Sequence, residues 1–234
     1  MASGIFVTGT DASVGKTFVS SLIVKTLRDD GIDAGYFKGV FNGGISGKCG
    51  NVIPNDAMKV KDVANLEEDY ENMGSYALKS QYSPHLAARV ESVNINLQKI
   101  IGDYSKMKEK YEFLIVEGSG GAVCPIKIEG DEIILLEDII KDLGLCTILV
   151  ARSGLGTINH TILTVNYLRS SGIEVRGIIL NEYDKNDIMH KNNKDVIELL
   201  TGIKNICTIP SMNNSYMPDE NIRELVKFCG TSFS

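Results

Sequence analysis

Short apolar runs alternate along the chain with segments of helical periodicity. Several of the runs have no polar alternation, which is typical of strands buried on both faces. The predicted strands cover 4–8, 34–37, 112–117, 146–151, 175–181 and 205–210. The predicted helices cover 16–29, 56–65, 84–91, 96–110, 133–142, 157–171, 187–201 and 219–228. This order favours right-handed βαβ units, so we expect an α/β fold with a doubly wound, mostly parallel sheet and helices on both faces.

Length and charge narrow the classes of protein. A chain of 234 residues without a Pro/Gly/Ser-rich linker is expected to form a single domain over 1–234. The formal net charge of -6 argues against a nucleic-acid partner held by broad phosphate neutralisation. A small anionic ligand remains compatible with this charge, because backbone N–H groups can bind phosphate inside an acidic protein.

The cysteines and the apolar runs predict the compartment. The 5 cysteines are scattered without a C-x-x-C pair, so we expect free thiols in a reducing cytoplasm. The first residues lack the pattern of a signal peptide, and no apolar run reaches the roughly 20 residues of a membrane helix. The prediction is a cytoplasmic protein without a membrane partner.

The stretch FVTGTDASVGKTFVSSLIV, residues 6–24, indicates a phosphate-binding loop. Such a loop normally has four residues between its glycines, whereas here five separate Gly9 from Gly15, and Thr10 stands at the glycine corner. A predicted strand precedes the loop and Lys16 opens a predicted helix. Lys16 would bridge the outer phosphates and the Thr17 hydroxyl could bind Mg²⁺. The alternative is a structural Gly-Lys-Thr at a helix start.

Carboxylates elsewhere could complete a metal–phosphate site. In EFLIVEGSGG, four apolar residues lead to Glu117 and then to a glycine-rich turn. Related folds place an acidic residue that binds the metal ion at this position, at the carboxyl edge of the sheet. An ordinary acid in a turn is the alternative. Asp56, considered alone, is a plausible helix N-cap.

Several motifs occur together and in a fixed order. They are FVTGTDASVGKT, FKGV with Lys38, PNDAM with Asp56, SPHLAA (83–88), VEGSGG (116–121), GTINHTILT (156–164) and ILNEYD (179–184). From about residue 4 to about residue 212, the sequence resembles the dethiobiotin synthetase family. The loop of that family carries the same additional residue.

The resemblance implies a P-loop NTPase fold with three α/β/α layers, and a homodimer whose active sites lie near the subunit interface. It also implies a ligase that uses MgATP and CO₂ to convert 7,8-diaminononanoate into dethiobiotin, ADP and phosphate. An amine takes up CO₂ as a carbamate, ATP phosphorylates the carbamate, and the second amine closes the ring.

The resemblance further implies roles for individual residues. The catalytic residues would be Lys38 and Lys16, and the Mg²⁺ ligands Thr17, Asp56 and Glu117. The ATP-binding residues would be Ser13, Val14, Gly15, Lys16, Thr17, Phe18, Asp56, Glu117, Gly118, Ser119, Gly120, Asn181, Glu182, Pro210, Ser211 and Met212. The substrate-binding residues would be Thr10, Asn42, Gly156, Thr157 and Asn159, the last three contributed by this helix start in the partner subunit.

Several of these residues have plainer interpretations. Lys38 could be a surface lysine at a strand end, and 156–159 could simply cap a helix. His85 and His160 match family positions but are better interpreted as hydrogen-bonded core histidines, and His190 as solvated. The sequence departs from the family pattern at four positions, namely Ala12, Gly39, Asn42 and Gly154. We expect these departures to affect substrate affinity more than ATP use.

Two other classes of protein share parts of the pattern. A switch-type ATPase of the partitioning and positioning class usually carries a second lysine early in the loop, whereas Lys16 is the only lysine in 1–24. Such a switch needs ATP to dimerise and a synthetase does not. The synthetase part of a glutamine-dependent amide-forming enzyme would continue into a glutaminase domain with a nucleophilic cysteine, but this chain stops at Ser234.

Overall fold

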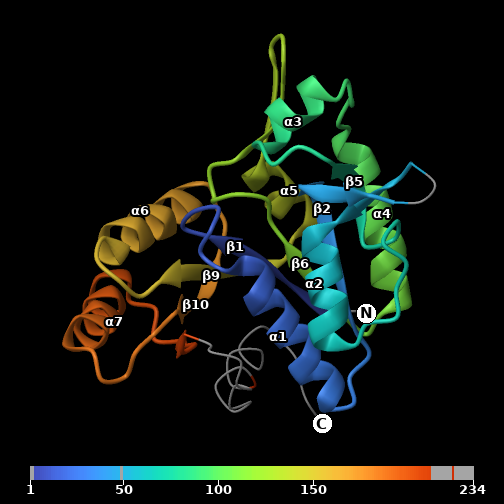
Figure 1. Ribbon diagram of the computed structural model, residues 1–234. Coiled ribbons are helices and arrows are strands. Elements are labelled where there is room, and N and C mark those ends of the chain that lie inside the picture. Colours follow the sequence, from blue (N-terminus) through green and yellow to red (C-terminus); the bar gives the residue numbers. More distant parts are fainter. Residues whose placement is uncertain (1–2, 48–49, 212–222, 224–234) are drawn as a thin grey trace.

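The computed structural model describes residues 3–47, 50–211 and 223, and its centre is a parallel sheet (Figure 1). The strand order is β11-β10-β9-β1-β6-β2-β5, and every neighbouring pair is parallel. The strands are β1 (Ser3–Gly9), β2 (Ala34–Asn42), β5 (Gly74–Leu78), β6 (Phe113–Glu117), β9 (Cys146–Arg152), β10 (Val175–Asn181) and β11 (Ile206–Thr208). The predicted doubly wound parallel sheet is confirmed.

Helices cover both faces of this sheet. They are α1 (Lys16–Asp29), α2 (Asn55–Ala64), α3 (Pro84–Val90), α4 (Leu97–Lys110), α5 (Leu136–Leu143), α6 (Thr157–Ser170) and α7 (Ile188–Thr201). α1 and α2 pack against each other in front of the sheet in the view of Figure 1. Because parallel crossovers are right-handed, α4 to α7 lie on the opposite face. The three-layer α/β/α arrangement is therefore also confirmed.

One predicted helix begins later than expected. Residues 133–135 belong to an antiparallel hairpin of β7 (Pro125–Glu129) and β8 (Glu132–Leu135), and α5 starts at Leu136. Gly130 turns the hairpin with φ 57°, and the exposed Ile133 alternates with the buried Ile134, which is the period of a strand. The helical interpretation of 133–135 is wrong for this reason.

Besides β7 and β8, three short strands were not predicted from the pattern. β3 (Gly44–Ser46) and β4 (Val52–Pro54) form a small antiparallel pair, and β5 lies at the edge of the main sheet. All three lack a continuous apolar run. The predicted helix over 219–228 lies outside the described residues except for Arg223.

The chain order brings loops from distant segments to one edge of the sheet. From the central β1 the chain moves to β2, β5 and β6 on one side, and then to β9, β10 and β11 on the other. The carboxyl ends of parallel strands meet where this reversal occurs, which is the usual ligand position in such folds. Ile5 and Ile115, fully buried on β1 and β6, belong to the core below this edge. Within the described residues, no helix is both long and apolar enough to cross a membrane.

Candidate active site

The loop between β1 and α1 curls around the side chain of its own lysine. Gly15, just before α1, has φ 96°, and a Cβ there would lie 2.1 Å from Nδ2 of Asn181, so a glycine is required. The Lys16 ammonium donates to the carbonyl oxygens of Asp11 at 2.8 Å and Ala12 at 3.0 Å. Burial lowers the pKa of Lys16 to about 8, although the Glu117 carboxylate opposes this shift.

Glu117, the last residue of β6, is the centre of a buried ionic cluster. Its Oε1 accepts hydrogen bonds from the Thr17 hydroxyl and the Lys38 ammonium, both at 2.8 Å. The same ammonium donates to Oδ2 of Asp56 at 2.6 Å. The structure therefore brings together four predicted residues from β2, α1, α2 and β6, and Lys16 lies close enough to interact electrostatically with this cluster.

Burial distinguishes Lys38 from a surface lysine. Its side chain is 5% exposed and that of Glu117 is 0% exposed. Burial alone would lower the pKa of Lys38, but the Glu117 and Asp56 carboxylates raise it well above its usual range. Burial would likewise raise the pKa of Asp56, but the Lys38 ammonium lowers it. The lysine is thus held as a cation at the edge of the phosphate loop.

The oxygen atoms of this cluster suit a hard divalent cation. A hydroxyl and two carboxylates, completed by phosphate oxygens and water, form the kind of ligand set that Mg²⁺ prefers. In the part of the chain that the structure describes, no group of three or more His, Cys, Asp or Glu gathers as a metal site. A cation here would depend on Thr17, Asp56 and Glu117 together with a nucleotide.

Two residues of the site were missed from the sequence. Tyr36, fully buried on β2, donates its hydroxyl to Oε2 of Glu117 at 2.9 Å, and burial raises its pKa well above the usual value. Arg152, at the end of β9, donates to the Ser13 carbonyl at 2.7 Å. The signals that could have found them are that Tyr36 lies two residues before Lys38 and that Arg152 lies at the end of a strand.

A cavity of about 390 Å³ lies beside the loop, toward α6 and α7. Its walls include five predicted residues, namely Thr10, Ser13, Val14, Thr157 and Glu182, the fourth of them on the first turn of α6. Gly156 precedes that turn with φ 91°. The Thr157 hydroxyl donates to the Arg152 carbonyl, and α6 is capped by Gly156 without a side-chain hydrogen bond, so the capping interpretation of Thr157 is wrong.

Asn181 lies directly against the phosphate loop. It is buried at the end of β10, and its Nδ2 donates to the Val14 carbonyl at 3.0 Å. In this arrangement one amide hydrogen is used for the loop, while the Ser153 hydroxyl donates to the Asn181 backbone carbonyl. Its predicted adenine contact stays a prediction.

The remaining predicted residues lie around this edge. Gly118, Ser119 and Gly120 follow β6, and the buried Ser119 hydroxyl donates to the Val40 carbonyl. The Asn42 amide donates to the Tyr82 carbonyl at 3.0 Å and so ties β2 to the segment before α3. The others are Phe18 on α1, the exposed Asn159 on α6, and the exposed Pro210 and Ser211 after β11. Met212 lies outside the described residues.

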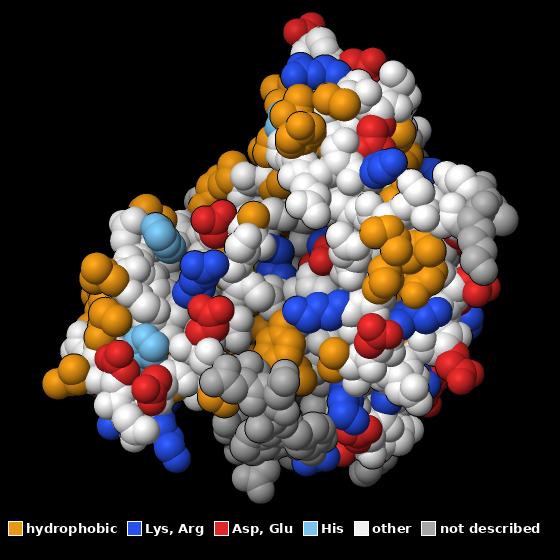
Figure 2. Space-filling view, viewed as in Figure 1, with side chains coloured by type: hydrophobic (Ala, Val, Ile, Leu, Met, Phe, Trp, Pro, Cys, Tyr) orange, Lys and Arg blue, Asp and Glu red, His pale blue; other side chains and the backbone are white. Residues whose placement is uncertain are grey.

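Figure 2 shows basic side chains in and beside a hollow near the middle of one face of the molecule. The hollow lies above α1 and the carboxyl edge of β1 in the shared view (Figure 1). This is the edge of the sheet at which the loops from distant segments meet. An anionic ligand could therefore reach the loop from this face.

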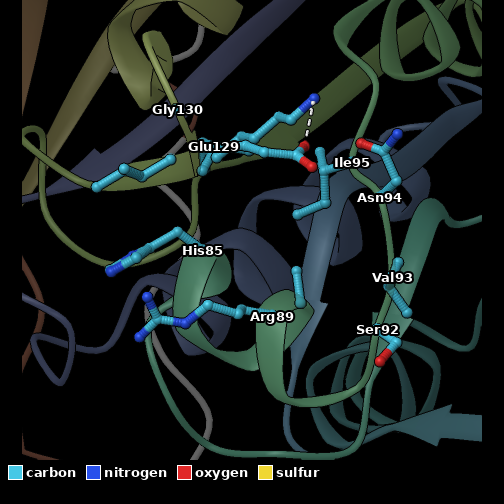
Figure 3. Close-up of a pocket in the computed structure, with 12 residues that line it drawn as sticks. His85, Arg89, Ser92, Val93, Asn94, Ile95, Glu129 and Gly130 are labelled. Atoms are coloured by element: carbon cyan, nitrogen blue, oxygen red, sulfur yellow. Dashed lines mark ion pairs between the residues drawn. The ribbon is translucent and has the colours of Figure 1, made fainter.

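The histidines differ from expectation. His160 is exposed and lines the 390 Å³ cavity beside the phosphate loop, so the core interpretation is wrong for it. His190 is half-buried rather than solvated, and its Nδ1 accepts from the Asp184 N–H at 2.8 Å. His85 is half-buried rather than part of the core, and with Arg89 it extends from α3 into a cavity of about 520 Å³ beside the β7–β8 hairpin (Figure 3).

Comparison with known proteins identifies the fold and the relatives. Residues 3–218 match the family described as AAA domain. A ParA family ATPase from Chlorobium tepidum has a similar structure, with a TM-score of 0.54, 14% identity and coverage of 98% of this chain and 91% of that one. MinD from Aquifex aeolicus, in complex with MinC, gives a TM-score of 0.54 at 16% identity over 97% and 85%. At these identities the likeness shows the fold alone.

Sequence relatives are much more similar. The ATP-dependent dethiobiotin synthetase BioD of Clostridium perfringens is 50% identical over 94% of this chain and 96% of its own length. The protein of the same name from Clostridium novyi is 45% identical over 92% of this chain and 90% of its own length. That from Brachyspira hyodysenteriae is 42% identical over 87% of this chain and 90% of its own length. With this identity over nearly its whole length, the chain belongs to the dethiobiotin synthetase family.

Proposed function

We propose that this protein carboxylates 7,8-diaminononanoate with CO₂ and closes the ureido ring with ATP, giving dethiobiotin, ADP and phosphate. The observation that carries the proposal is the convergence of Lys16, Lys38, Thr17, Asp56 and Glu117 at the phosphate loop. Relatives of the same length and up to 50% identity carry the name of this ATP-dependent synthetase.

The buried lysines suit the charge that this reaction develops. An amine of the substrate adds to CO₂ as a carbamate, and a carbamate oxygen then attacks the γ-phosphorus while ADP leaves. Negative charge grows on the transferred group, so fixed cations at this point lower the barrier. Lys16 would hold the β- and γ-phosphates, and Lys38 would face the carbamate. The second amine then attacks the carbonyl carbon, phosphate leaves, and the ring closes.

Thr17, Asp56 and Glu117 would hold Mg²⁺, which supplies positive charge to the phosphates when bound. All three side chains already share Lys38 or each other as hydrogen-bond partners, so the chain itself orients their oxygen atoms. Backbone N–H groups around Gly15 and the start of α1 would bind phosphate oxygens. Asn181 and the segment from Pro210 would flank the base.

We also propose that the enzyme works as a single-domain homodimer in the cytoplasm. The first turn of α6, with Gly156, Thr157 and Asn159, would bind the carboxylate of the substrate held by the partner subunit. Leu155 is 93% exposed and Leu163 is 61% exposed next to this turn, as an apolar contact with a second copy would require. The buried thiol of Cys124 fits a reducing compartment.

The test is the dependence of ATP turnover on both co-substrates. The purified protein should release ADP only when diaminononanoate and bicarbonate are both present, with one dethiobiotin detected by mass spectrometry for each ADP. Lys38→Met should reduce this rate by roughly 10²- to 10³-fold, because a cation next to the transferred group is lost.

Lys110→Met is the matched control. Lys110 also pairs with a buried carboxylate, that of Glu68, but it lies at the end of α4, in a different part of the fold. Its variant should keep the wild-type rate. Equal ADP release without the diamine, or ATP-dependent dimerisation without product, would contradict the synthetase and favour a switch-type ATPase.

A further inference from the structure

Tyr36 is a buried polar side chain that the reaction described above does not use. It lies on β2, two residues before Lys38, so the two side chains emerge on the same face of the sheet. Phe37 between them points to the other face, where its ring packs against Tyr104. Both Tyr36 and Lys38 reach the carboxylate of Glu117 on the neighbouring strand.

The two oxygen atoms of Glu117 have different surroundings. Oε2 accepts the Tyr36 hydroxyl at 2.9 Å, whereas Oε1 accepts from Thr17 and Lys38. The tyrosine and the carboxylate are both fully buried, so no water competes for this hydrogen bond. A terminal carboxylate torsion is otherwise broad. The tyrosine therefore fixes the plane of the Glu117 carboxylate, with one oxygen held by Tyr36 and the other turned toward Thr17 and Lys38.

We infer that Tyr36 is a positioning residue that holds the Glu117 carboxylate so that Oε1 is presented to the divalent cation of the nucleotide. The inference rests on the proposed function of Glu117. Hydrogen bonds to the non-ligating atoms of a metal ligand orient it, and their loss typically weakens metal binding by about 10- to 100-fold. Tyr36 would act through Glu117, since its side chain is fully buried and its hydroxyl donates to Oε2 of that carboxylate.

The chain contains a matched control for the removal of such a hydroxyl. Tyr111, also buried, donates to Oε2 of the buried Glu68 at 2.7 Å. Tyr111→Phe deletes the same kind of bond outside the phosphate loop, at the end of α4, where the Tyr111 ring lies against Gly35 on the other face of β2 from Tyr36. A merely structural role for Tyr36 predicts that Tyr36→Phe and Tyr111→Phe behave alike in every assay.

The experiment measures Mn²⁺ binding to the full chain with a non-hydrolysable ATP analogue, by electron paramagnetic resonance of free Mn²⁺. Tyr36→Phe should raise the dissociation constant by about 10- to 100-fold, and Tyr111→Phe should leave it within about twofold. Binding of a fluorescent ATP analogue in EDTA should be unchanged in both variants. In turnover, Tyr36→Phe should raise the Mg²⁺ concentration needed for half-maximal rate, with kcat at saturating Mg²⁺ nearly restored.

A second measurement covers the case in which Tyr36→Phe does not fold. Wild-type protein labelled with ¹³C at the tyrosine ζ carbon should show the Tyr36 line shifting when Mg²⁺ and the analogue are added, while the Tyr111 line, assigned through Tyr111→Phe, stays fixed. Wild-type Mn²⁺ affinity in Tyr36→Phe, or an unmoved Tyr36 line, overturns the inference. The proposed function fails separately, if the wild-type protein makes no dethiobiotin.

Discussion

Two buried carboxylates, Glu117 at the phosphate loop and Glu68 between α2 and β5, are held by the same kinds of donor. Each accepts a tyrosine hydroxyl on Oε2, from Tyr36 at 2.9 Å and from Tyr111 at 2.7 Å. Each also pairs with a lysine, at 2.8 Å for Glu117 and 2.6 Å for Glu68. Glu68 is 2% exposed and Glu117 is equally buried. A buried Tyr–Glu–Lys group is therefore not, in itself, a mark of a functional site.

The two groups differ in how their hydrogen bonds are completed. The Oε1 atom of Glu68 accepts from the Asn72 amide and the Asp69 backbone N–H, which lie in the same short connection. Glu117 instead shares its lysine with a second carboxylate, Asp56, and its Oε1 with the Thr17 hydroxyl. The first group closes a local turn and ties it to the end of α4. The second joins four elements at the edge of the sheet where loops meet, and all of its donors and acceptors are suited to phosphate and metal chemistry.

The sharpest way to break this comparison is to neutralise each carboxylate in turn. Glu117→Gln should reduce the rate of dethiobiotin formation by roughly 10²- to 10³-fold, because an amide gives no charge to a cation–phosphate centre. The rate is measured as ADP released with both co-substrates present. Glu68→Gln should keep at least half of the wild-type rate per folded molecule. A Glu117→Gln enzyme with more than a tenth of wild-type activity would remove the distinction between the two groups.

Most of the functional cluster could be predicted because its residues follow recognisable local patterns. Lys16 and Thr17 stand where a strand, a loop and a helix follow one another, and Glu117 ends an apolar run before glycines. Lys38 follows a predicted strand, although β2 continues beyond it to Asn42. These features depend on neighbours in the sequence, so a pattern can detect them.

The parts that could not be predicted depend on which strands become neighbours. Tyr36 looks like one more residue of an apolar run, and its role depends on β2 lying beside β6, an order that periodicity does not encode. The β7–β8 hairpin was not predicted for another reason. Its isoleucine-rich β8 sequence leads directly into α5, so strand and helix periods overlap around Ile134.

A second prediction concerns stability, for which we expect Glu68 rather than Glu117 to be the more important carboxylate. Burial would raise the pKa of Glu68, but the donors Lys110, Asn72 and Tyr111 lower it to about 2. A carboxylate whose pKa is lowered on folding stabilises the protein above its ordinary pKa, and this contribution is lost as the pH falls toward the folded value. Glu68→Gln should therefore unfold more easily at pH 7, by about 2–3 kcal/mol.

The measurement is urea unfolding of wild type and Glu68→Gln between pH 7 and pH 3. The difference in free energy of unfolding should be largest at pH 7 and shrink below about pH 4.5, as the unfolded-state carboxylate of the wild type takes up its proton. A difference that stays constant over this range would show that Glu68 acts through packing rather than through its charge.

The smallest effect should come from the lysine of the Glu68 group. Lys110 is 53% exposed, so water already solvates much of its ammonium, and an ion pair of this kind contributes at most about 1 kcal/mol. Lys110→Met should therefore lower the free energy of unfolding by less than Glu68→Gln does, since Asn72, Tyr111 and the Asp69 N–H continue to solvate the carboxylate. Thermal and urea unfolding of both variants at low and high salt provide the measurement, and salt should narrow the gap between wild type and Lys110→Met. A loss for Lys110→Met as large as that for Glu68→Gln would mean that this carboxylate depends on its lysine as closely as Glu117 does, and exposure would then be a poor guide to which of the two ion pairs matters.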